Sequence, residues 1–347
     1  MRLRVGASIG GDIVSLMVVG TVALDSVETP FGKVEEALGG TASYFAFAAR
    51  HYTDVKIVAV VGQDFPEKYR QLFKSHHVEV AGLQTLPGRT FRWAGQYDFD
   101  LNTAHTLDTQ LNVLVDFHPA LPADYRASKL VFLGNIDPNL QMDVLAQTGS
   151  PRLTVLDSMN YWIERKKEDL TRVIQRVDIV LLNEAEVRQY AQNYSLLAAA
   201  RSILALGPKA IIIKKGEYGA LMISQDVGEE IFIAPAYPLE SVKDPTGAGD
   251  SFAGGFLGYL ASTGDFSTTG IRKAMVHGSV IASFTVEDFS VNRLLSATRE
   301  EIEERYQEFQ RLTFFEHSCK HADDCQRLAF SWAGGLGRHR QSSYQSS

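Results

Sequence analysis

Cysteine is almost absent from this chain of 347 residues, and the two that occur, Cys319 and Cys325, lie close to the C-terminus. The fold therefore cannot depend on disulfide bonds, and this usage is typical of the reducing cytoplasm, where we expect the protein. Apolar runs of the ~20 residues that a membrane helix needs are also absent, so no membrane partner is expected. Long blocks of one charge are missing too, and with a net charge of -7 nucleic acid is not an expected partner.

The two ends of the sequence differ in character from the rest. Residues 1–12 are predicted to be a peripheral extension, and residues 317–347, which show no apolar period, a disordered tail. A signal peptide at residues 13–24 is a minor alternative, because no small-residue cleavage site follows. The histidines and cysteines of the tail match no common zinc spacing, so we favour chance clustering there. The folded domain is expected to span residues 13–316.

Short apolar runs alternate with longer amphipathic stretches along most of the chain. The predicted strands are residues 18–24, 56–61, 129–133, 153–156, 178–182 and 210–214, and the predicted helices are residues 41–50, 67–77, 184–192 and 196–206. The strands are almost continuously apolar, as expected when helices cover both faces of a sheet. This order predicts an α/β fold with a doubly wound, mostly parallel sheet flanked by helices.

One region interrupts this alternation. Residues 90–100 and 105–115 are polar and aromatic by turns, with no convincing helix between them. They are predicted to form antiparallel strands outside the main sheet. A small β lid, made of residues 26–38 and 88–116, and an ordinary edge hairpin are both open interpretations.

The most informative stretch is residues 244–256, DPTGAGDSFAGGF. Gly247, Ala248 and Gly249 lie where a helix begins, and there the backbone N–H groups lack partners and the helix dipole is positive. Such a start binds anions. Asp250 follows in the first turn, where an acid is often only a helix cap. An acid beside an anion hole suits phosphoryl transfer, because it accepts the proton of the attacking hydroxyl.

This string resembles the C-terminal signature of the ribokinase-like, PfkB-type carbohydrate kinases. Other pieces occur in the order of that family. They are Gly39-Gly40, Val61-Gly62-Gln63-Asp64, Asn183-Glu184-Ala185-Glu186 and the turn at residues 214–220. The resemblance spans residues 18–315, nearly the whole body of the chain.

The resemblance implies roles for residues that contact ATP and Mg²⁺. Asp250 would be the general base, and Gly247, Ala248 and Gly249 would supply the anion hole. The residues implied for the nucleotide are Asn183, Lys214, Gly216, Gly219 and His277. Asn183 and Glu186 would order Mg²⁺ through water, because Mg²⁺ keeps several waters. A strand exit into a capped helix is the alternative explanation of the same residues.

On the acceptor side the resemblance implies Asp25, Gly39, Gly40, Tyr44 and Asn135. The family usually has Asn where this chain has Tyr44, so a donor and acceptor amide is replaced by a phenol. Plain ribose is therefore in doubt as a substrate. Further candidates, taken from the predicted lid, are Trp93, Tyr97 and Asn102.

Asp244 and Thr246 match positions that help to bind K⁺ in ribokinase-like enzymes. The rest of that site usually includes a turn with glycine, and the matching residues 286–290 (VEDFS) contain none. Activation by K⁺ is therefore left open.

The leading hypothesis is an ATP- and Mg²⁺-dependent kinase that phosphorylates a hydroxyl of a small sugar or sugar-like molecule. Nucleosides and cyclitols are open alternatives within the same fold. A non-catalytic nucleotide- or sugar-binding regulatory protein is the alternative of another class. A nicotinamide dehydrogenase is disfavoured, because no G-x-G-x-x-G follows the first strand. A homodimer formed through the lid is a further expectation.

Overall fold

The computed structural model describes residues 14–225 and 230–314. The predicted extension, the predicted tail and both cysteines lie outside these ranges. The chain divides into a main unit that ends at Phe309 and a second unit that begins at Gln310, and the account below concerns the main unit. Among the described residues, no helix is both long enough and apolar enough to cross a membrane.

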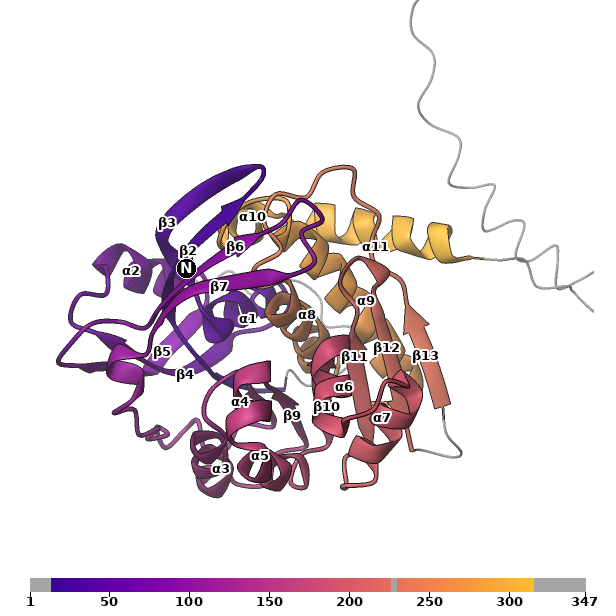
Figure 1. Cartoon of the computed structure of the whole chain (residues 1–347), viewed down its shortest axis with the longest axis horizontal. Coiled ribbons are helices and arrows are strands. Elements are labelled where there is room, and N and C mark those ends of the chain that lie inside the picture. Colours follow the sequence, from indigo (N-terminus) through magenta and orange to yellow (C-terminus); the bar gives the residue numbers. More distant parts are fainter. Residues whose placement is uncertain (1–13, 226–229, 315–347) are drawn as a thin grey trace, which may run out of the picture. The chain divides into compact units, whose positions relative to one another are not determined.

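A large sheet forms the centre of the main unit (Figure 1). Its strand order is β13-β12-β11-β10-β9-β8-β1-β4-β5. The bounds are β1 Leu16–Val19, β4 Val55–Gly62, β5 Val78–Leu86, β8 Leu130–Leu133, β9 Leu153–Asp157, β10 Ile179–Asn183, β11 Ala210–Lys214, β12 Ala220–Ser224 and β13 Glu230–Ala234. In this order, the seven strands β11, β10, β9, β8, β1, β4 and β5 are parallel to their neighbours. At one edge, β12 pairs antiparallel with both β11 and β13. The predicted doubly wound, mostly parallel sheet is confirmed.

Alternate side chains of each strand enter two separate cores. In β1, Leu16 and Val18 belong to one core, and Met17 and Val19 belong to the other. The first core is covered by α1 Thr41–Ala49, α2 Glu67–Ser75, α8 Ala248–Thr263, α9 Thr268–Thr285, α10 Asn292–Ser296 and α11 Arg299–Thr313. The second is covered by α3 Pro138–Gln147, α4 Asn160–Arg165, α5 Lys167–Ile174, α6 Glu184–Ala191 and α7 Leu196–Leu204. Burial on both faces explains the nearly continuous apolar strands.

The prediction of one continuous strand at residues 18–24 was wrong. The chain leaves the large sheet after β1 and enters a second sheet as β2, Ala23–Thr29. The break is fixed by Thr21, whose carbonyl accepts a hydrogen bond from Ala42 N at 2.9 Å and whose hydroxyl accepts one from Thr41 N at 3.1 Å. Apolar periodicity continues through the break, so it did not mark the change of sheet. The change places Asp25 on the second sheet.

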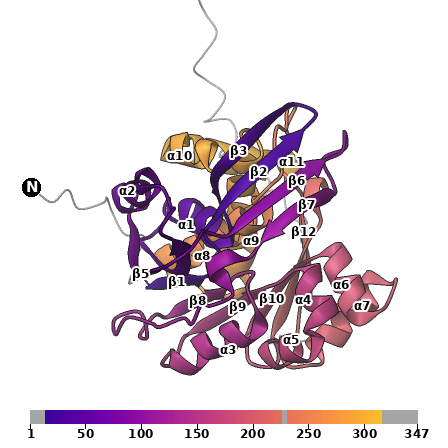
Figure 2. The same cartoon turned by 60° about the vertical axis from the view of Figure 1, so that its left-hand side comes forward.

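The second sheet has the order β3-β2-β6-β7, with β3 Gly32–Gly39, β6 Arg92–Tyr97 and β7 Ala104–Gln110. Figures 1 and 2 show it as a layer apart from the large sheet. Strands β6 and β7 pair antiparallel, as predicted, whereas β2 and β6 pair parallel. The segment is therefore not an edge hairpin of the large sheet.

Helix α8 packs unusually closely against α1. A Cβ atom at Gly254 would lie 2.4 Å from the carbonyl oxygen of Phe45, and one at Gly258 would lie 3.1 Å from Ala49 Cα. These two glycines are four residues apart and so share one face of the helix. Because glycine has no side chain, the two backbones approach closely, and this contact positions α8 against α1.

Candidate active site

Polar side chains gather where three neighbouring strands of the large sheet end. Asp157, Asn183 and Lys214 are the last residues of β9, β10 and β11. The carboxyl ends of parallel strands form the ligand-binding edge of an open α/β sheet. The start of α8 and the second sheet bring Asp250 and Asp25 to the same region.

The start of α8 offers backbone amides to an anion. Gly247 is the N-cap residue with φ +77°, a left-handed conformation that favours glycine. Within the described ranges, the amide nitrogens of Gly247 and Gly249 have no hydrogen-bond partner, whereas Ala248 N donates to Pro245 O at 3.2 Å. Of the three predicted anion-hole residues, Gly247 and Gly249 therefore have amides available for a phosphate.

Asp250 lies in the first turn of this helix, as predicted. Burial raises the pKa of its carboxyl to about 7, and the nearby Asp157 carboxylate raises it further, while Lys214 and a hydrogen bond with Thr41 act in the opposite sense. A carboxyl whose pKa lies near 7 has the proton affinity that general base catalysis needs near neutral pH.

Asp157 is a member of this group that the sequence analysis missed. Its Oδ2 lies 2.6 Å from Lys214 Nζ, and its Oδ1 accepts a hydrogen bond from Ser158 N at 2.8 Å. Both side chains are largely buried, with exposed fractions of 3% for Asp157 and 17% for Lys214. An acid that follows an apolar strand directly was the signal available in the sequence.

Asn183 and Glu186 form a reciprocal helix cap at the start of α6. Asn183 Oδ1 accepts from Glu186 N at 2.8 Å, and Glu186 Oε2 accepts from Asn183 N at 2.7 Å. Burial raises the pKa of Glu186 to about 7, and Lys214 opposes this while Asp157 and Asp250 add to it. The cap that was considered as the alternative explanation is therefore present, and the Glu186 carboxyl also faces the acids and the cation of the site.

The residues present fit a Mg²⁺ ion that arrives with the phosphates. In residues 14–225 and 230–314 no group of three or more His, Cys, Asp or Glu side chains is arranged to hold a metal by itself. Mg²⁺ usually keeps several waters and binds through one or two carboxylates together with substrate phosphates. Glu186 uses Oε2 for its cap, and its Oε1 accepts no hydrogen bond from a described residue.

Asp25 and the glycine pair form the second half of the site. Asp25 Oδ2 accepts a hydrogen bond from Gly40 N at 3.3 Å. A Cβ atom at Gly39 would lie 1.8 Å from the same oxygen, so a side chain at Gly39 would displace Asp25. Burial raises the pKa of Asp25 to about 7, the Gly40 amide opposes this, and Asp244 and Asp250 add to it.

Tyr44 is fully buried between the two halves. Its ring lies against Gly247, where a Cβ atom would be 2.3 Å from the ring carbons Cγ and Cδ1. Burial raises the pKa of its phenol, and the charges of Asp25, Asp244 and Asp250 act in the same direction. The phenol that replaces the amide of the family therefore faces the acids of the site and supports the start of α8.

The second sheet contacts the start of α8 through Tyr97. The hydroxyl of Thr246 donates to Tyr97 Oη at 3.2 Å. At the end of the same hairpin, Asn102 Nδ2 donates to Glu217 Oε1 at 3.3 Å, next to Gly216. The predicted lid residues Tyr97 and Asn102 thus reach the loops of the candidate site, whereas Trp93 donates through Nε1 to Thr106 of its own sheet at 3.2 Å.

The remaining predicted residues have other local partners. Asn135 Oδ1 accepts from Trp162 Nε1 at 2.9 Å. Gly216 begins the turn η2, Gly216–Tyr218, with φ +55°, and Gly219 follows this turn with φ +88°. His277 is stacked between the rings of Tyr259 and Tyr306, with centroids 4.2 and 4.3 Å away, and its Nδ1 lies 3.0 Å from Tyr52 Oη. An adenine contact for His277 stays a prediction.

Asp244 precedes the start of α8 and is completely buried. Its Oδ1 accepts from Thr246 N at 2.9 Å, while Oδ2 is buried without a hydrogen-bond partner among the described residues. A buried carboxylate oxygen without a partner is costly. The Asp244 side chain therefore fits a bound monovalent cation. The neighbouring Lys243 is paired with Asp288, with Nζ and Oδ1 2.6 Å apart.

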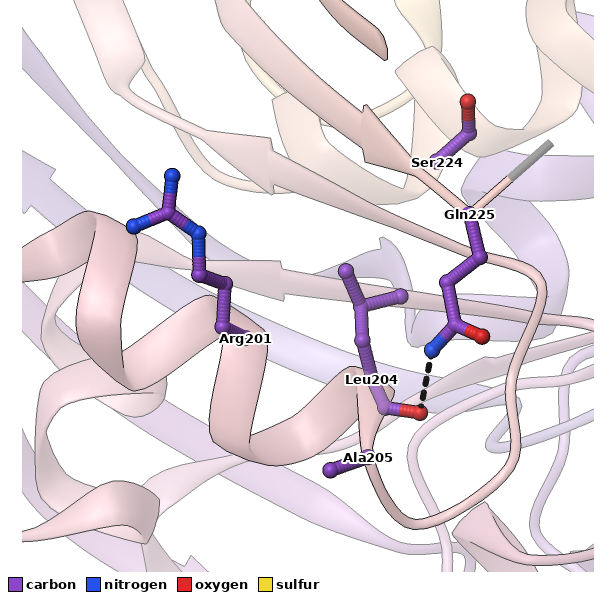
Figure 3. A pocket seen from close by; sticks show the side chains of 5 residues that line it. All are labelled: Arg201, Leu204, Ala205, Ser224 and Gln225. Carbon is purple, nitrogen blue, oxygen red and sulfur yellow. Dashed lines mark hydrogen bonds between the residues drawn. The ribbon is translucent and has the colours of Figure 1, made fainter. Parts of the chain in front are cut away.

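A separate hollow of about 270 Å³ lies outside this region (Figure 3). It is lined by Arg201, Leu204, Ala205, Ser224 and Gln225, and the Gln225 amide donates to Leu204 O at 2.7 Å. Ser224, which lines the hollow, pairs with Ala210 at the amino end of β11, whereas Lys214 of the candidate site is at its carboxyl end. The hollow therefore lies at the other end of this strand from the candidate site.

Comparison with known proteins relates this arrangement to kinases. Residues 139–297 match the pfkB family carbohydrate kinase model. A cytidine kinase of Thermococcus kodakarensis is 32% identical over 250 residues, which cover 71% of this chain and 88% of that protein. The nucleoside kinase of Burkholderia thailandensis, solved with inosine, has a TM-score of 0.68 at 22% identity and covers 85% of this chain and 98% of its own. An E. coli ribokinase II structure with ATP and Mg²⁺ has a TM-score of 0.66 at 18% identity, over 85% and 99% of the two chains.

The solved structures support the fold, and the cytidine kinase supports the family, because its identity extends over most of both chains. The predicted ribokinase-like fold is confirmed by the solved structures. The predicted kinase activity is confirmed by the family model and the cytidine kinase. The chain belongs to the pfkB family of carbohydrate kinases and is a phosphotransferase.

Proposed function

We propose that this kinase transfers the γ-phosphoryl group of ATP to a hydroxyl on the sugar of a nucleoside. The observation that carries the proposal is the meeting of Asp25, Asp250 and the free amides of Gly247 and Gly249 in one buried region. This set provides a group to hold hydroxyls, a group to accept a proton and donors for a phosphate.

Each residue then has a defined task in the transfer. Asp25 orients the acceptor by accepting hydrogen bonds from its hydroxyls. As the new bond between the acceptor oxygen and phosphorus forms and the bond from phosphorus to the ADP oxygen breaks, Asp250 takes the hydroxyl proton. The amides of Gly247 and Gly249 stabilise the charge on the phosphoryl oxygens. Bound Mg²⁺, held through Glu186 and Asn183, would supply further charge neutralisation.

Two observations support a nucleoside rather than a free sugar. The cytidine kinase and the inosine-bound nucleoside kinase are similar to this chain. In addition, Tyr44 stands where sugar kinases of the family usually carry an amide, and Tyr97 covers the same region from the second sheet. Aromatic rings can contact a base, whereas an amide is suited to sugar hydroxyls.

The test is a panel of nucleosides, sugars and inositols with ATP and Mg²⁺, scored by ADP release and by the phosphorylated product. Asp250→Asn should reduce turnover by about 10²–10⁴-fold while nucleotide binding is retained. Asp143→Asn, an exposed position on α3, is the matched control and should leave turnover unchanged. Turnover of sugars but not nucleosides would reject the nucleoside assignment and keep the kinase.

A non-catalytic binding protein predicts a different result. In that case ligands would raise the melting temperature without any phosphorylated product from the whole panel. Near-normal turnover of Asp250→Asn would instead remove Asp250 from the role of base.

The lid function of the second sheet, a homodimer formed through it and a cytoplasmic location stay predictions. Strands β3 and β7 are its two edges, and β7 is largely exposed. Exposed edges favour pairing with another chain. Light scattering that gives the mass of a monomer at micromolar concentration would contradict the dimer.

A further inference from the structure

Lys214 and Asp157 form a buried ion pair beside the start of α8. Lys214 Nζ lies 2.6 Å from Asp157 Oδ2. It also lies 3.1 Å from the position that a Cβ atom of Gly249 would occupy, so the ammonium borders an amide without a partner. The cation is thus already next to the group that would bind a phosphate.

The charges around Lys214 show that it does more than balance one acid. Burial lowers the pKa of Lys214, but Asp157, Glu186 and Asp250 raise it, and the net change is upward, so the side chain is charged. The ammonium lies among three carboxyls whose pKa values burial raises, so it supplies positive charge beside the start of α8. A buried ion pair is weak evidence for stability, because both charges lose their hydration.

The neighbouring lysine provides a contrast within the same turn. Lys215 has an exposed side-chain fraction of 33% and lies 3.7 Å from Glu184, outside the buried group. A lysine that only attracted anions to this face could occupy either position. Lys214, in contrast, is buried beside Gly249, where its ammonium can contact the same phosphate as the Gly249 amide.

We propose that Lys214 is a catalytic cation, whose ammonium moves from Asp157 to the oxygens of the transferred phosphoryl group, and that Asp157 is its positioning residue. The proposal rests on the kinase function proposed above. The ammonium keeps its proton throughout, because Asp250 takes the proton of the acceptor. The bond from phosphorus to the ADP oxygen breaks and the bond to the acceptor forms, and Lys214 stabilises the oxygens that carry the charge between these events.

The experiment compares Lys214→Met, Asp157→Asn, the double variant that carries both changes, and Lys215→Met as the control. Lys214→Met should lower kcat by about 10²–10³-fold, the loss typical of removing one charge-stabilising donor, and raise KM for ATP by no more than about tenfold. It should also lower the melting temperature, because Asp157 loses its partner. Asp157→Asn should lower kcat by about tenfold at an unchanged melting temperature, which a merely structural role would not produce.

The double variant separates catalysis from charge balance. It should recover part of the melting temperature that Lys214→Met loses, since the carboxylate paired directly with Lys214 is gone, yet keep the low kcat. Recovery of kcat to within threefold of the unchanged enzyme would overturn the proposal, because Lys214 would then serve only Asp157. An equal loss in Lys215→Met would overturn it as well.

Binding of ATP and of ADP, each with Mg²⁺ and measured by calorimetry, gives an independent readout without any acceptor. Lys214→Met should weaken ATP binding by about tenfold and ADP binding by less than twofold. An unchanged preference for ATP over ADP would overturn the proposal. If the unchanged enzyme phosphorylates nothing in the panel, the proposed function fails, and this comparison still decides the role of Lys214 in binding the γ-phosphoryl group.

Discussion

The phosphate half and the acceptor half of the candidate site both contain buried acids, but these acids have different partners. The phosphate half, at the ends of β9 to β11 and the start of α8, pairs its acids with a buried cation, since Lys214 lies among Asp157, Glu186 and Asp250. In the acceptor half, on β2 and α1, no cation of residues 14–225 or 230–314 pairs with Asp25, which accepts a hydrogen bond from the Gly40 amide. A phosphate needs positive charge, whereas a neutral hydroxyl needs an acceptor. The difference implies that changes in each half should affect one substrate and spare the other.

The strongest test of this division is Asp25→Asn. Loss of the carboxylate should reduce kcat/KM for the acceptor by about 10²–10³-fold, because the hydroxyls lose a charged hydrogen-bond acceptor. KM for ATP should stay within about twofold. Steady-state kinetics with each substrate varied in turn measures both values. A similar rise in KM for ATP would show that the two halves are not separate.

The same variant makes a prediction about stability. Burial raises the pKa of Asp25 to about 7, so the folded protein favours its protonated form. Ionisation at pH 8 therefore costs stability, and Asn imitates the protonated acid. Because the unfolded chain releases this proton from about pH 4 upward, the cost grows between about pH 4 and pH 7 and is then constant. Asp25→Asn should raise the melting temperature by about 2–5 °C at pH 8 and by little at pH 4. An equal rise at both pH values would contradict the assigned pKa.

The dependence of activity on pH concerns both halves together. Asp25 and Asp250 each have a pKa of about 7 and must be ionised to accept hydrogen bonds or a proton. The value of kcat/KM for the acceptor should therefore fall by about tenfold or more per pH unit below about 6.5, and level off above about 8. Asp157→Asn should shift the midpoint downward, since Asp157 raises the pKa of Asp250. A midpoint near 4 would contradict burial as the dominant effect.

The sequence predicted the phosphate half better than the acceptor half for a physical reason. Backbone amides and a glycine turn leave a local signature, so Gly247 to Asp250 could be placed at a helix start from the string alone. Asp157 is distant in sequence from Lys214, and only the pairing of β9 with β10 and of β10 with β11 brings them together. The break between β1 and β2 was not predicted, because apolar periodicity does not show which sheet a strand joins.

Tyr44 links the two halves, and two substitutions separate its contributions. Tyr44→Phe keeps the ring that packs against Gly247 and should change kcat by less than about threefold. Tyr44→Asn restores the amide usual in sugar kinases of the family but removes a fully buried ring, so it should lower the melting temperature and shift the preference from nucleosides toward free sugars. The ratio of kcat/KM for a nucleoside to that for ribose measures the shift. An unchanged ratio in Tyr44→Asn would exclude Tyr44 from acceptor selection.

A modest effect on kcat is expected from a monovalent cation at Asp244. Burial raises the pKa of this carboxyl, and its Oδ2 has no hydrogen-bond partner among the described residues, three positions before Gly247. Neutralising that charge should favour a phosphate at the start of α8, so replacing tetramethylammonium, which is too large for a buried site, by K⁺ at constant ionic strength should raise kcat by about fivefold. Asp244→Asn should abolish the difference between the two cations, because the charge to be neutralised is gone. A K⁺ effect that persists in Asp244→Asn would place the cation elsewhere, and equal rates of the unchanged enzyme in both salts would contradict a cation site at Asp244.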